Sequence, residues 1–299
     1  MVTPVQWSYG KRCHANIDKI RGDKYIPRTC SFRTIKLRTM LSKNKQKLIR
    51  SLQQKKYRDR HGLFLAEGCK IVEELLQEGA EAYILAGTEK WIREHSLLLN
   101  NLKVTPDLLG EKEMKSVSLM STPQEVLAVF RKPVYSPARE NVEQSISLAL
   151  DNIQDPGNLG TIIRMAEWFG IHDIFCSPGT ADAFNPKVVQ ATMGSLFRVK
   201  VHYIPLEEVL ERFPPPGPPH VYGTFPDGDC LYDTPLDYRG IIVLGNEGSG
   251  ISPALLPRIH RKISIPSHPG SGLDSLNVAV SAAVVCAEFR RRQRKVNRG

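Results

Sequence analysis

The sequence predicts an α/β fold built from two layered units, and three observations carry this prediction. From residue 41 onward, short apolar runs of strand length alternate with segments of helical periodicity. A polar stretch after Phe130 separates two such series. The 299 residues, 41% apolar and 24% charged, are enough for two ordinary domains with their own cores. A peptide hormone, a disulfide miniprotein and a fibrous chain are excluded.

Residues 1–39 are predicted to form a disordered basic leader. They show no period and mix Lys, Arg and Pro with isolated aromatic residues. Three interpretations compete: a nucleic-acid-binding arm, a transit peptide, and a translated leader upstream of a true start at Met40. We favour the last, because an ordered pattern begins directly after Met40, and because two acidic residues and a modest serine content weaken the transit-peptide interpretation.

Residues 40–133 are predicted to form the first α/β domain. Apolar residues from Leu41 recur at helical spacing among many lysines and arginines, which predicts a basic helix ending at Gly62. A strand is expected at 63–66, a helix from Gly68 and a further strand at 82–86. The polar residues 134–145 are expected to form a linker.

Residues 146–299 are predicted to form a second domain around a sheet. Its helices are expected at 161–170 and 276–294, with residues 152–160 as a loop and with Trp168 and Phe169 in the core. Apolar runs predict the strands, which are expected at 146–150, 171–176, 199–204, 221–224, 241–244 and 262–265.

The basic charge of the chain is unevenly distributed. The net charge is +10, of which residues 1–39 contribute +7, residues 40–133 contribute +4 and residues 134–299 contribute −1, although the last segment ends in a basic tail from Arg290. This favours a polyanionic partner that binds at the N-terminal end of the protein. The alternative is a basic surface that contacts only solvent. The candidate contacts are Lys55, Lys56, Arg58 and Arg60.

The cysteines and the apolar runs exclude two further classes. Six cysteines stand far apart, with no Cys-x-x-Cys pair and no zinc-finger spacing, so free thiols in a reducing cytoplasm and no metal are expected. No uncharged apolar run approaches the roughly 18 residues of a membrane span. A cytoplasmic protein with no membrane partner is therefore predicted.

Three polar, glycine-bearing loops in the second domain adjoin predicted strands, at 151–160, 244–252 and 265–277. Loops at one edge of a parallel sheet are where such sheets bind ligands. The middle loop nearly matches a phosphate-binding loop, but Ile251 stands where that motif needs Lys, and Glu247 would repel a triphosphate. A nucleotide-hydrolysing enzyme is therefore disfavoured, and a neutral or cationic ligand fits better.

Motifs in the three loops together carry a family resemblance. The first pairs Asn158 with Arg164, the second is Gly245-Asn-Glu247-Gly-Ser-Gly-Ile251, and the third joins Ile265-Pro266 to Ser275-Leu-Asn277. In this order they resemble the SpoU (TrmH-type) family of the SPOUT superfamily, the RNA ribose 2′-O-methyltransferases. Residues 43–132 are similar to the L30e-like accessory domain of that family, through the segment 55–68 and Thr122-Pro-Gln124.

The resemblance implies a fold, a cofactor and an assembly. The fold is a C-terminal knotted (trefoil) parallel-sheet methyltransferase domain with a smaller N-terminal L30e-like α/β domain. The methyl donor would be S-adenosyl-L-methionine, bound in the knot of a homodimer whose site lies near the subunit interface. The residues expected to contact this cofactor are Thr224, Leu244, Gly245, Asn246, Gly248, Ile265, Pro266, Ser275 and Leu276.

The chemistry assigns roles to the polar motif residues. Methyl transfer to a ribose hydroxyl needs in-line placement and help in removing a proton, and requires no metal. Arg164 is expected to polarise the hydroxyl, although an arginine is too basic to serve as a literal base. Asn158, Ser275 and Asn277 are expected to orient the nucleotide, with Glu247 supplying negative charge. Each of them alone is also a common helix cap or surface residue; their joint order indicates the site.

The predicted function is therefore S-adenosylmethionine-dependent 2′-O-ribose methylation of structured RNA. Ribosomal RNA is favoured over transfer RNA, because the accessory domain resembles a ribosomal RNA-binding fold. Lys55, Lys56, Arg58 and Arg60 would dock the RNA, with a solvated helix face as the alternative. The alternative function is a non-catalytic RNA-binding or ribosome-assembly protein that retains the fold.

Overall fold

The computed structural model describes residues 38–39, 41–135, 143–214, 217–237 and 239–296. The described residues belong to one compact unit. Except for residues 38 and 39, the predicted leader 1–39 lies outside the described residues, as do Met40 and most of the linker expected at 134–145.

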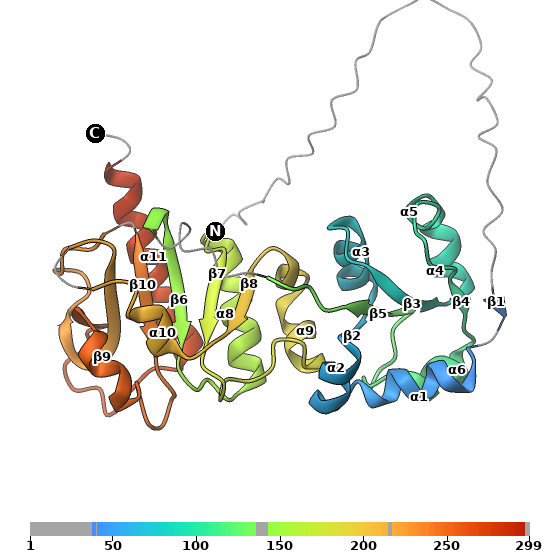
Figure 1. The fold of residues 1–299 in the computed structure, drawn as a ribbon, viewed down its shortest axis with the longest axis horizontal. Coiled ribbons are helices and arrows are strands. Elements are labelled where there is room, and N and C mark those ends of the chain that lie inside the picture. The colour runs from blue at the N-terminus through green and yellow to red at the C-terminus, as the bar shows by residue number, and fades with distance from the viewer. Residues whose placement is uncertain (1–37, 40, 136–142, 215–216, 238, 297–299) are drawn as a thin grey trace, which may run out of the picture. The chain divides into compact units, whose positions relative to one another are not determined.

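The N-terminal half, residues 38–131, forms a mixed sheet (Figure 1). The strand order is β1-β4-β3-β5-β2, and β5 runs antiparallel to both β3 and β2. The elements are β1 (Arg38–Thr39), α1 (Lys43–Ser51), α2 (Lys55–His61), β2 (Leu63–Glu67), α3 (Cys69–Gln77), β3 (Ala82–Gly87), α4 (Glu89–Glu94), α5 (Ser96–Leu99), β4 (Asp107–Leu108), α6 (Glu111–Val117) and β5 (Val126–Arg131).

The C-terminal half, residues 146–296, forms a second sheet of order β11-β9-β10-β6-β7-β8. Every neighbouring pair in it is parallel, which confirms the predicted parallel sheet. The elements are β6 (Ile146–Leu150), α8 (Pro156–Trp168), β7 (Asp173–Cys176), α9 (Pro186–Thr192), η1 (Ser195–Phe197), β8 (Lys200–Tyr203), α10 (Leu206–Leu210), β9 (His220–Cys230), β10 (Gly240–Leu244), η2 (Pro253–Arg258), β11 (Arg261–Ser264) and α11 (Val278–Val296).

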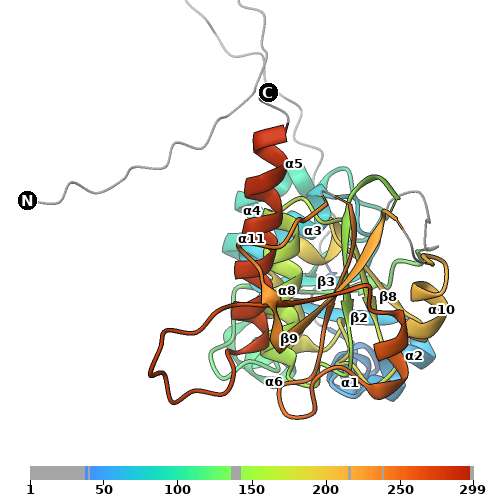
Figure 2. The same cartoon turned by 90° about the vertical axis from the view of Figure 1, so that its left-hand side faces the viewer.

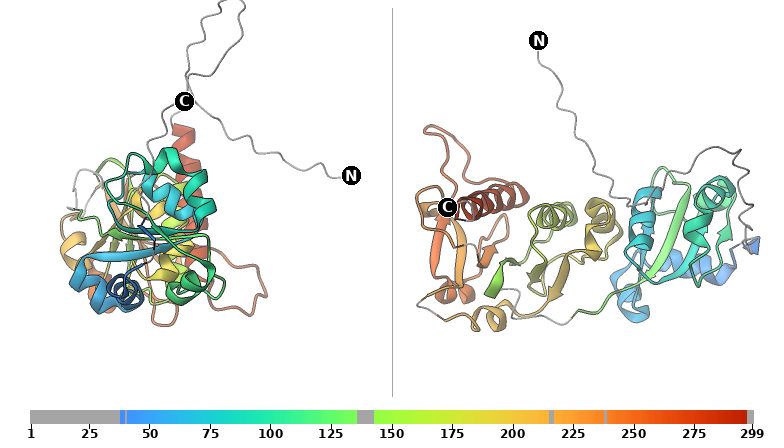
Figure 3. Two further views of the ribbon diagram at one scale, coloured as in Figure 1. Left: turned by 90° about the vertical axis from the view of Figure 1, so that its right-hand side faces the viewer. Right: turned by 90° about the horizontal axis from the view of Figure 1, so that it is seen from above.

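Helices cover both faces of the second sheet (Figure 3). In β10, Ile242 and Leu244 pack into the core beneath α8, α9 and α11, whereas Ile241 and Val243 pack into a separate core with α10. A strand covered on both faces needs apolar residues at every position. This is why the sheet strands appear in the sequence as uninterrupted apolar runs.

Helix α8 begins earlier than the sequence analysis expected. The Asp155 carboxylate accepts a hydrogen bond from the Asn158 backbone N–H at 2.8 Å, and Pro156 occupies the first helical position. Gly160 lies inside the helix, where an added Cβ would stand 2.5 Å from the Cβ of Ala191 in α9. The glycine permits close helix packing, so the loop predicted through residue 160 is wrong and Asn158 lies in the first helical turn.

The single basic helix predicted before Gly62 is broken into α1 and α2. At the break, the Arg58 guanidinium donates to the carbonyl oxygens of Leu52 and Gln53, both at 2.8 Å, and so satisfies groups that a continuous helix would satisfy itself. Arg58 also pairs with Asp182 at 2.7 Å and is only 2% exposed. The prediction that Arg58 contacts RNA is therefore wrong, because the side chain is buried in an internal ion pair.

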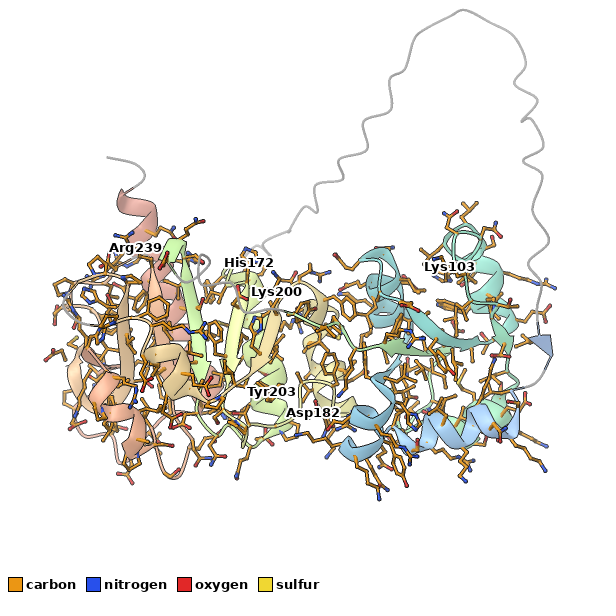
Figure 4. The ribbon with its side chains drawn as sticks, in the orientation of Figure 1. Lys103, His172, Asp182, Lys200, Tyr203 and Arg239 are labelled. Carbon is orange, nitrogen blue, oxygen red and sulfur yellow. The ribbon has the colours of Figure 1, made fainter. Side chains whose placement is uncertain are left out.

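Asp182 belongs to a loop that Tyr203 also holds (Figure 4). The Tyr203 hydroxyl donates to the Ala181 carbonyl oxygen and accepts from the Ala183 N–H at 2.7 Å. The pair of Arg58 and Asp182 thus joins α2 of the N-terminal half to a braced loop of the C-terminal half.

The two halves also share apolar packing. Phe64 of β2 is fully buried, and its ring centroid lies 5.0 Å from that of Phe184 and 6.1 Å from that of Phe197. Aromatic contacts of this kind stabilise an interface beyond the area they bury. The two sheets are therefore joined through a common core as well as by the linker.

Helix α11 is anchored at its C-terminal end by arginines that the sequence suggested were a basic tail. Arg290 donates to the carbonyl oxygens of Phe169, at 2.6 Å, and Gly170, at the end of α8. Arg292 donates to the Thr234 carbonyl oxygen at 2.7 Å. Hydrogen bonds from Arg291 lower the pKa of Glu288 to about 2. Partial desolvation opposes this shift, and hydrogen bonds from Arg292 add to it.

Two neighbouring aromatic residues near the end of α8 differ in burial. Trp168 is 77% exposed, so its predicted place in the core is wrong, whereas Phe169 is partly buried against the core. The buried face of α8 is formed by Leu159, Ile162 and Ile163, and Trp168 lies off that face.

Among the described residues, no helix has both the length and the apolar character needed to cross a bilayer.

Asp182→Ala should destabilise the protein strongly. It leaves the buried Arg58 guanidinium without its carboxylate, and breaking a buried ion pair from one side costs about 3 kcal/mol. The matched control is Asp59→Ala, whose carboxylate is 52% exposed and pairs with Lys132; it should cost less than about 1 kcal/mol. Urea unfolding measures both, and equal losses would contradict the assigned burial.

Candidate active site

A chain of hydrogen bonds joins the three predicted motifs. The Asn158 side-chain amide donates to the Glu247 carboxylate, and its oxygen accepts from the Asn277 amide at 2.9 Å. Asn158 comes from the first turn of α8, Glu247 from the loop after β10, and Asn277 from the residue before α11. The structure therefore brings together side chains that are 89 and 119 positions apart in sequence.

Asn277 has two functions in this arrangement. Its side-chain oxygen accepts from the backbone N–H groups of Ala279, at 3.0 Å, and Val280, at 3.3 Å, as an N-cap does. Its amide nitrogen remains free to donate to Asn158. Capping therefore fixes the direction of the amide instead of competing with a role in the site.

The loop after β10 is held by Asn246. The Asn246 side-chain oxygen accepts from the N–H groups of Gly248, at 2.9 Å, and Ser249, and its nitrogen donates to the Asn152 carbonyl oxygen. Asn152, in the loop after β6, has a φ of 58°. Both amide ends of Asn246 are used within the protein, and its backbone N–H and C=O bond to Gly250 at 3.0 and 2.9 Å, so Asn246 shapes the loop.

Gly245 permits the tightest backbone approach in this loop. A Cβ at this position would lie 2.3 Å from the carbonyl carbon of Gly250 and 2.4 Å from the nitrogen of Ile251. At Gly248 the nearest atom would be 3.5 Å away. Gly245 therefore needs to be glycine for the loop to close, and Gly250, with a φ of 68°, also favours glycine, whereas Gly248 is under neither constraint.

A cleft of about 1020 Å³ lies beside the hydrogen-bonded chain. Its lining includes every residue predicted to contact the cofactor, and these are Thr224, Leu244, Gly245, Asn246, Gly248, Ile265, Pro266, Ser275 and Leu276. Glu247 also lines it, whereas Asn158, Asn277 and Arg164 do not. The loop between β11 and α11, which forms one wall, projects from the fold at the lower left of Figure 2.

Some lining residues were missed by the sequence analysis. Ser281 and Val285 of α11 face the cleft together with Val278. Their spacing of three and seven residues is that of one helix face, so the helical period after Asn277 would have found them. Phe225, His268 and Asp274 also line the cleft, and no motif singled them out.

The cleft fits S-adenosylmethionine. The apolar side chains of Leu244, Ile263 and Val278 suit an adenine ring, and the exposed carboxylate of Glu247 suits a cationic sulfonium. Within the described ranges no group of three or more His, Cys, Asp or Glu side chains has the arrangement of a metal site.

Arg164 lies away from the cleft of its own chain. It is exposed on α8, and six residues beyond Asn158 it points about 120° away around the helix axis. Within the described part of the chain, no carboxylate comes within ion-pairing distance of it. The structure therefore does not bring Arg164 together with Asn158 and Glu247 within this chain.

The predicted RNA contacts lie elsewhere, on α2. Lys55, Lys56 and Arg60 are exposed, in contrast to the buried Arg58. Lys56 lies over the ring of Tyr57, 4.9 Å from its centroid, so part of this surface combines a cation with an aromatic ring.

Proteins with a similar sequence or structure define the class of this one. Over 245 residues the chain is 32% identical to the 23S rRNA (guanosine(2553)-2′-O)-methyltransferase of Bacillus subtilis, a match that covers 81% of this chain and 94% of that protein. The AdoMet-bound rRNA methyltransferase of Sinorhizobium meliloti superimposes with a TM-score of 0.75 at 29% identity, over 86% and 98% of the two chains. This protein is an RNA methyltransferase, and its methyl donor is S-adenosylmethionine.

Matches to two family models identify the family of this protein. Residues 145–287 match the SpoU rRNA Methylase family, and residues 43–128 match the MRM3-like substrate binding domain. A TrmH-family protein from Porphyromonas gingivalis has a TM-score of 0.73 at 40% identity, over 85% of this chain and 99% of that one. The chain belongs to the SpoU rRNA methylase family.

Gly245→Ala should abolish cofactor binding. The added methyl group would collide with the backbone of Gly250 and open the loop, so we expect at least a hundredfold loss of affinity, about 2.7 kcal/mol. Gly248→Ala, in the same loop but with room for a Cβ, should stay within about twofold of wild type. Titration calorimetry with S-adenosylmethionine measures both, and equal affinities would contradict this account of the loop.

Proposed function

We propose that the protein methylates the 2′-hydroxyl of one ribose in ribosomal RNA. The observation that carries the proposal is the hydrogen-bonded chain of Glu247, Asn158 and Asn277 beside the cleft. The names of two relatives support the chemistry and the RNA: the Bacillus enzyme, and the 23S rRNA (uridine(2479)-2′-O)-methyltransferase of Streptomyces viridochromogenes, which is 29% identical over 250 residues.

When bound, S-adenosylmethionine supplies an electrophilic methyl group. Backbone groups of Leu244, Gly245, Ile265 and Leu276 would hold its adenosine. The Asn158 amide is bonded at both ends, so it presents a fixed orientation to a neighbouring nucleotide. Ser275, exposed at the cleft rim, would orient the hydroxyl, and the Glu247 carboxylate would stabilise positive charge in the cleft.

Arg164 completes the site from a second copy of the chain. Its guanidinium would polarise the 2′-hydroxyl or bind the adjacent phosphate, which lowers the cost of removing the hydroxyl proton. Trp168, 77% exposed on the same helix, supports a homodimer through this face, because aromatic side chains are enriched at protein interfaces. This assembly would carry Arg164 to the partner's cleft.

The N-terminal half docks the RNA through Lys55, Lys56 and Arg60, whose phosphate contacts supply affinity and little sequence choice. Its L30e-like character and the trefoil knot of the C-terminal half are part of the proposal. The support for the knot is the strand order, in which β10 lies between β9 and β6. The free thiols of Cys69, Cys176, Cys230 and Cys286 support a cytoplasmic location.

A non-catalytic scaffold is the less favoured function. A protein that only binds RNA needs neither a cleft of this size nor an asparagine bonded at both ends beside it. The intact arrangement of motif residues therefore favours catalysis.

Loss of the protein should remove one 2′-O-methyl group from ribosomal RNA. Mapping 2′-O-methylation in RNA from cells with and without the gene measures this, and wild type should restore the site whereas Arg164→Ala should not. The control is Arg93→Ala, an exposed arginine on α4 that should restore the site fully. An unchanged methylation map in the deletion strain would refute the proposal.

Two inactive variants should complement each other in a mixed dimer. Gly245→Ala chains lack the cofactor site but keep Arg164, and Arg164→Ala chains have the reverse defect. If Arg164 acts in the partner's cleft, each heterodimer holds one complete site, so an equilibrated equal mixture should recover about a quarter of wild-type activity. A mixture as inactive as its components would show that Arg164 acts within its own chain.

A further inference from the structure

Arg198 joins three carboxylates at the boundary between the two halves. It follows η1, and its guanidinium bonds to Glu167 of α8, to Glu78 at 3.0 Å and to Glu74 of α3 at 3.1 Å. All four side chains are between 25% and 41% exposed. Ion pairs arranged around one arginine cost less side-chain entropy than separate pairs, so this cluster is a defined structural feature.

The backbone turn at residues 193 and 194 leaves room for the Glu74 carboxylate. Gly194 has a φ of 95°, and a Cβ there would lie 2.0 Å from the carboxylate oxygen of Glu74. Met193 before it also has a positive φ, of 50°. Two successive left-handed residues are uncommon outside functional or tightly constrained turns. The turn therefore brings Glu74 against Arg198 at some conformational cost.

Glu167 lies one helical turn after Arg164. Residues three apart on a helix are neighbours, and a glutamate in that position ordinarily pairs with an arginine. Here both carboxylate oxygens of Glu167 accept from Arg198 instead, the second at 3.3 Å. Desolvation opposes the effect, but the hydrogen bonds from Arg198 and Ser195 and the charges of Arg198 and Arg164 lower the pKa of Glu167, so it is ionised at neutral pH.

We propose that Arg198 is a positioning residue for catalysis: it holds the Glu167 carboxylate away from Arg164, so that the Arg164 guanidinium remains free to reach RNA. This rests on the proposed role of Arg164 in methyl transfer. Because Glu74 lies in α3 and Glu78 caps the C-terminus of that helix, the same cluster also ties the catalytic helix to the RNA-docking half. Without Arg198, the Glu167 carboxylate loses its partner and forms an ion pair with Arg164 instead.

Arg198→Met, which keeps the side-chain length and removes the charge, tests this. We expect kcat for tritiated methyl transfer to total RNA from cells lacking the protein to fall about fivefold, which corresponds to about 1 kcal/mol. The affinity for S-adenosylmethionine should not change, because none of the cluster residues lines the cleft. Arg198→Met/Glu167→Gln should recover most of kcat, since a neutral amide no longer captures Arg164. Glu167→Gln alone should stay near wild type.

The matched control is Arg198→Met/Glu74→Gln. It removes a carboxylate from the same cluster and relieves the same repulsion, but it leaves Glu167 beside Arg164. A purely structural role for Arg198 predicts that both double variants recover kcat and thermal stability equally. Our proposal predicts that both recover stability and that only the Glu167→Gln variant recovers kcat. Equal recovery, no recovery, or an unchanged kcat in Arg198→Met would overturn it.

A readout without catalysis separates this inference from the proposed function. In nitrogen-15 spectra of the arginine side chains, the Nε–H of Arg164 should exchange rapidly with water in the wild type and more slowly in Arg198→Met, where Glu167 accepts from it. An unchanged exchange rate overturns the inference. If the wild type transferred no methyl group to RNA, the proposed function would fail, while the spectra would still decide whether Arg198 frees Arg164.

Discussion

The site depends on one asparagine amide whose two ends are both hydrogen-bonded. Asn158 donates to the carboxylate of Glu247 and accepts from the amide of Asn277, so three segments distant in sequence are held by a single planar group. An aspartate in its place could not donate to Glu247, and a hydrophobic residue could bond to neither partner. The parallel sheet makes this possible, because strands β6 and β10 end at the same edge and release their loops side by side.

The junction between the two sheets is a second constraint, and it has an apolar part and a charged part. Phe64, Phe184 and Phe197 form its apolar part, and Arg58 and Arg198 each tie the N-terminal half to the C-terminal half by ion pairs. Interfaces between domains of one chain often permit relative motion, unless they are apolar and well packed. Here aromatic packing and charge pairing together favour a fixed relation between the basic surface of α2 and helix α8.

Much of the fold and most of the cleft could be predicted from the sequence, for reasons that particular residues show. The strand at 146–150 appears as an apolar run because both its faces are covered, and the residues predicted to hold the cofactor line one cleft because their motifs follow strands of one sheet. The start of α8 was misplaced because Gly160 suggested a loop, whereas it serves close packing against Ala191. Arg58 was misjudged because no local pattern tells a buried arginine from its exposed neighbours; its partner Asp182 is 124 residues away. The position of Arg164 outside its own cleft follows from helical geometry, which the motif spacing alone did not reveal.

Helix α11 begins directly after Asn277, which bonds to Asn158. Near its other end, Arg290 donates to the carbonyl oxygen of Phe169 after α8, and Arg292 donates to that of Thr234 after β9. Its first turns supply Val278, Ser281 and Val285 to the wall of the cleft. The position of that wall therefore also depends on the opposite end of the helix, where Arg290 and Arg292 do not line the cleft. In an enzyme of this design, substitutions of Arg290 or Arg292 would alter how tightly the methyl donor is held while every motif residue stayed the same.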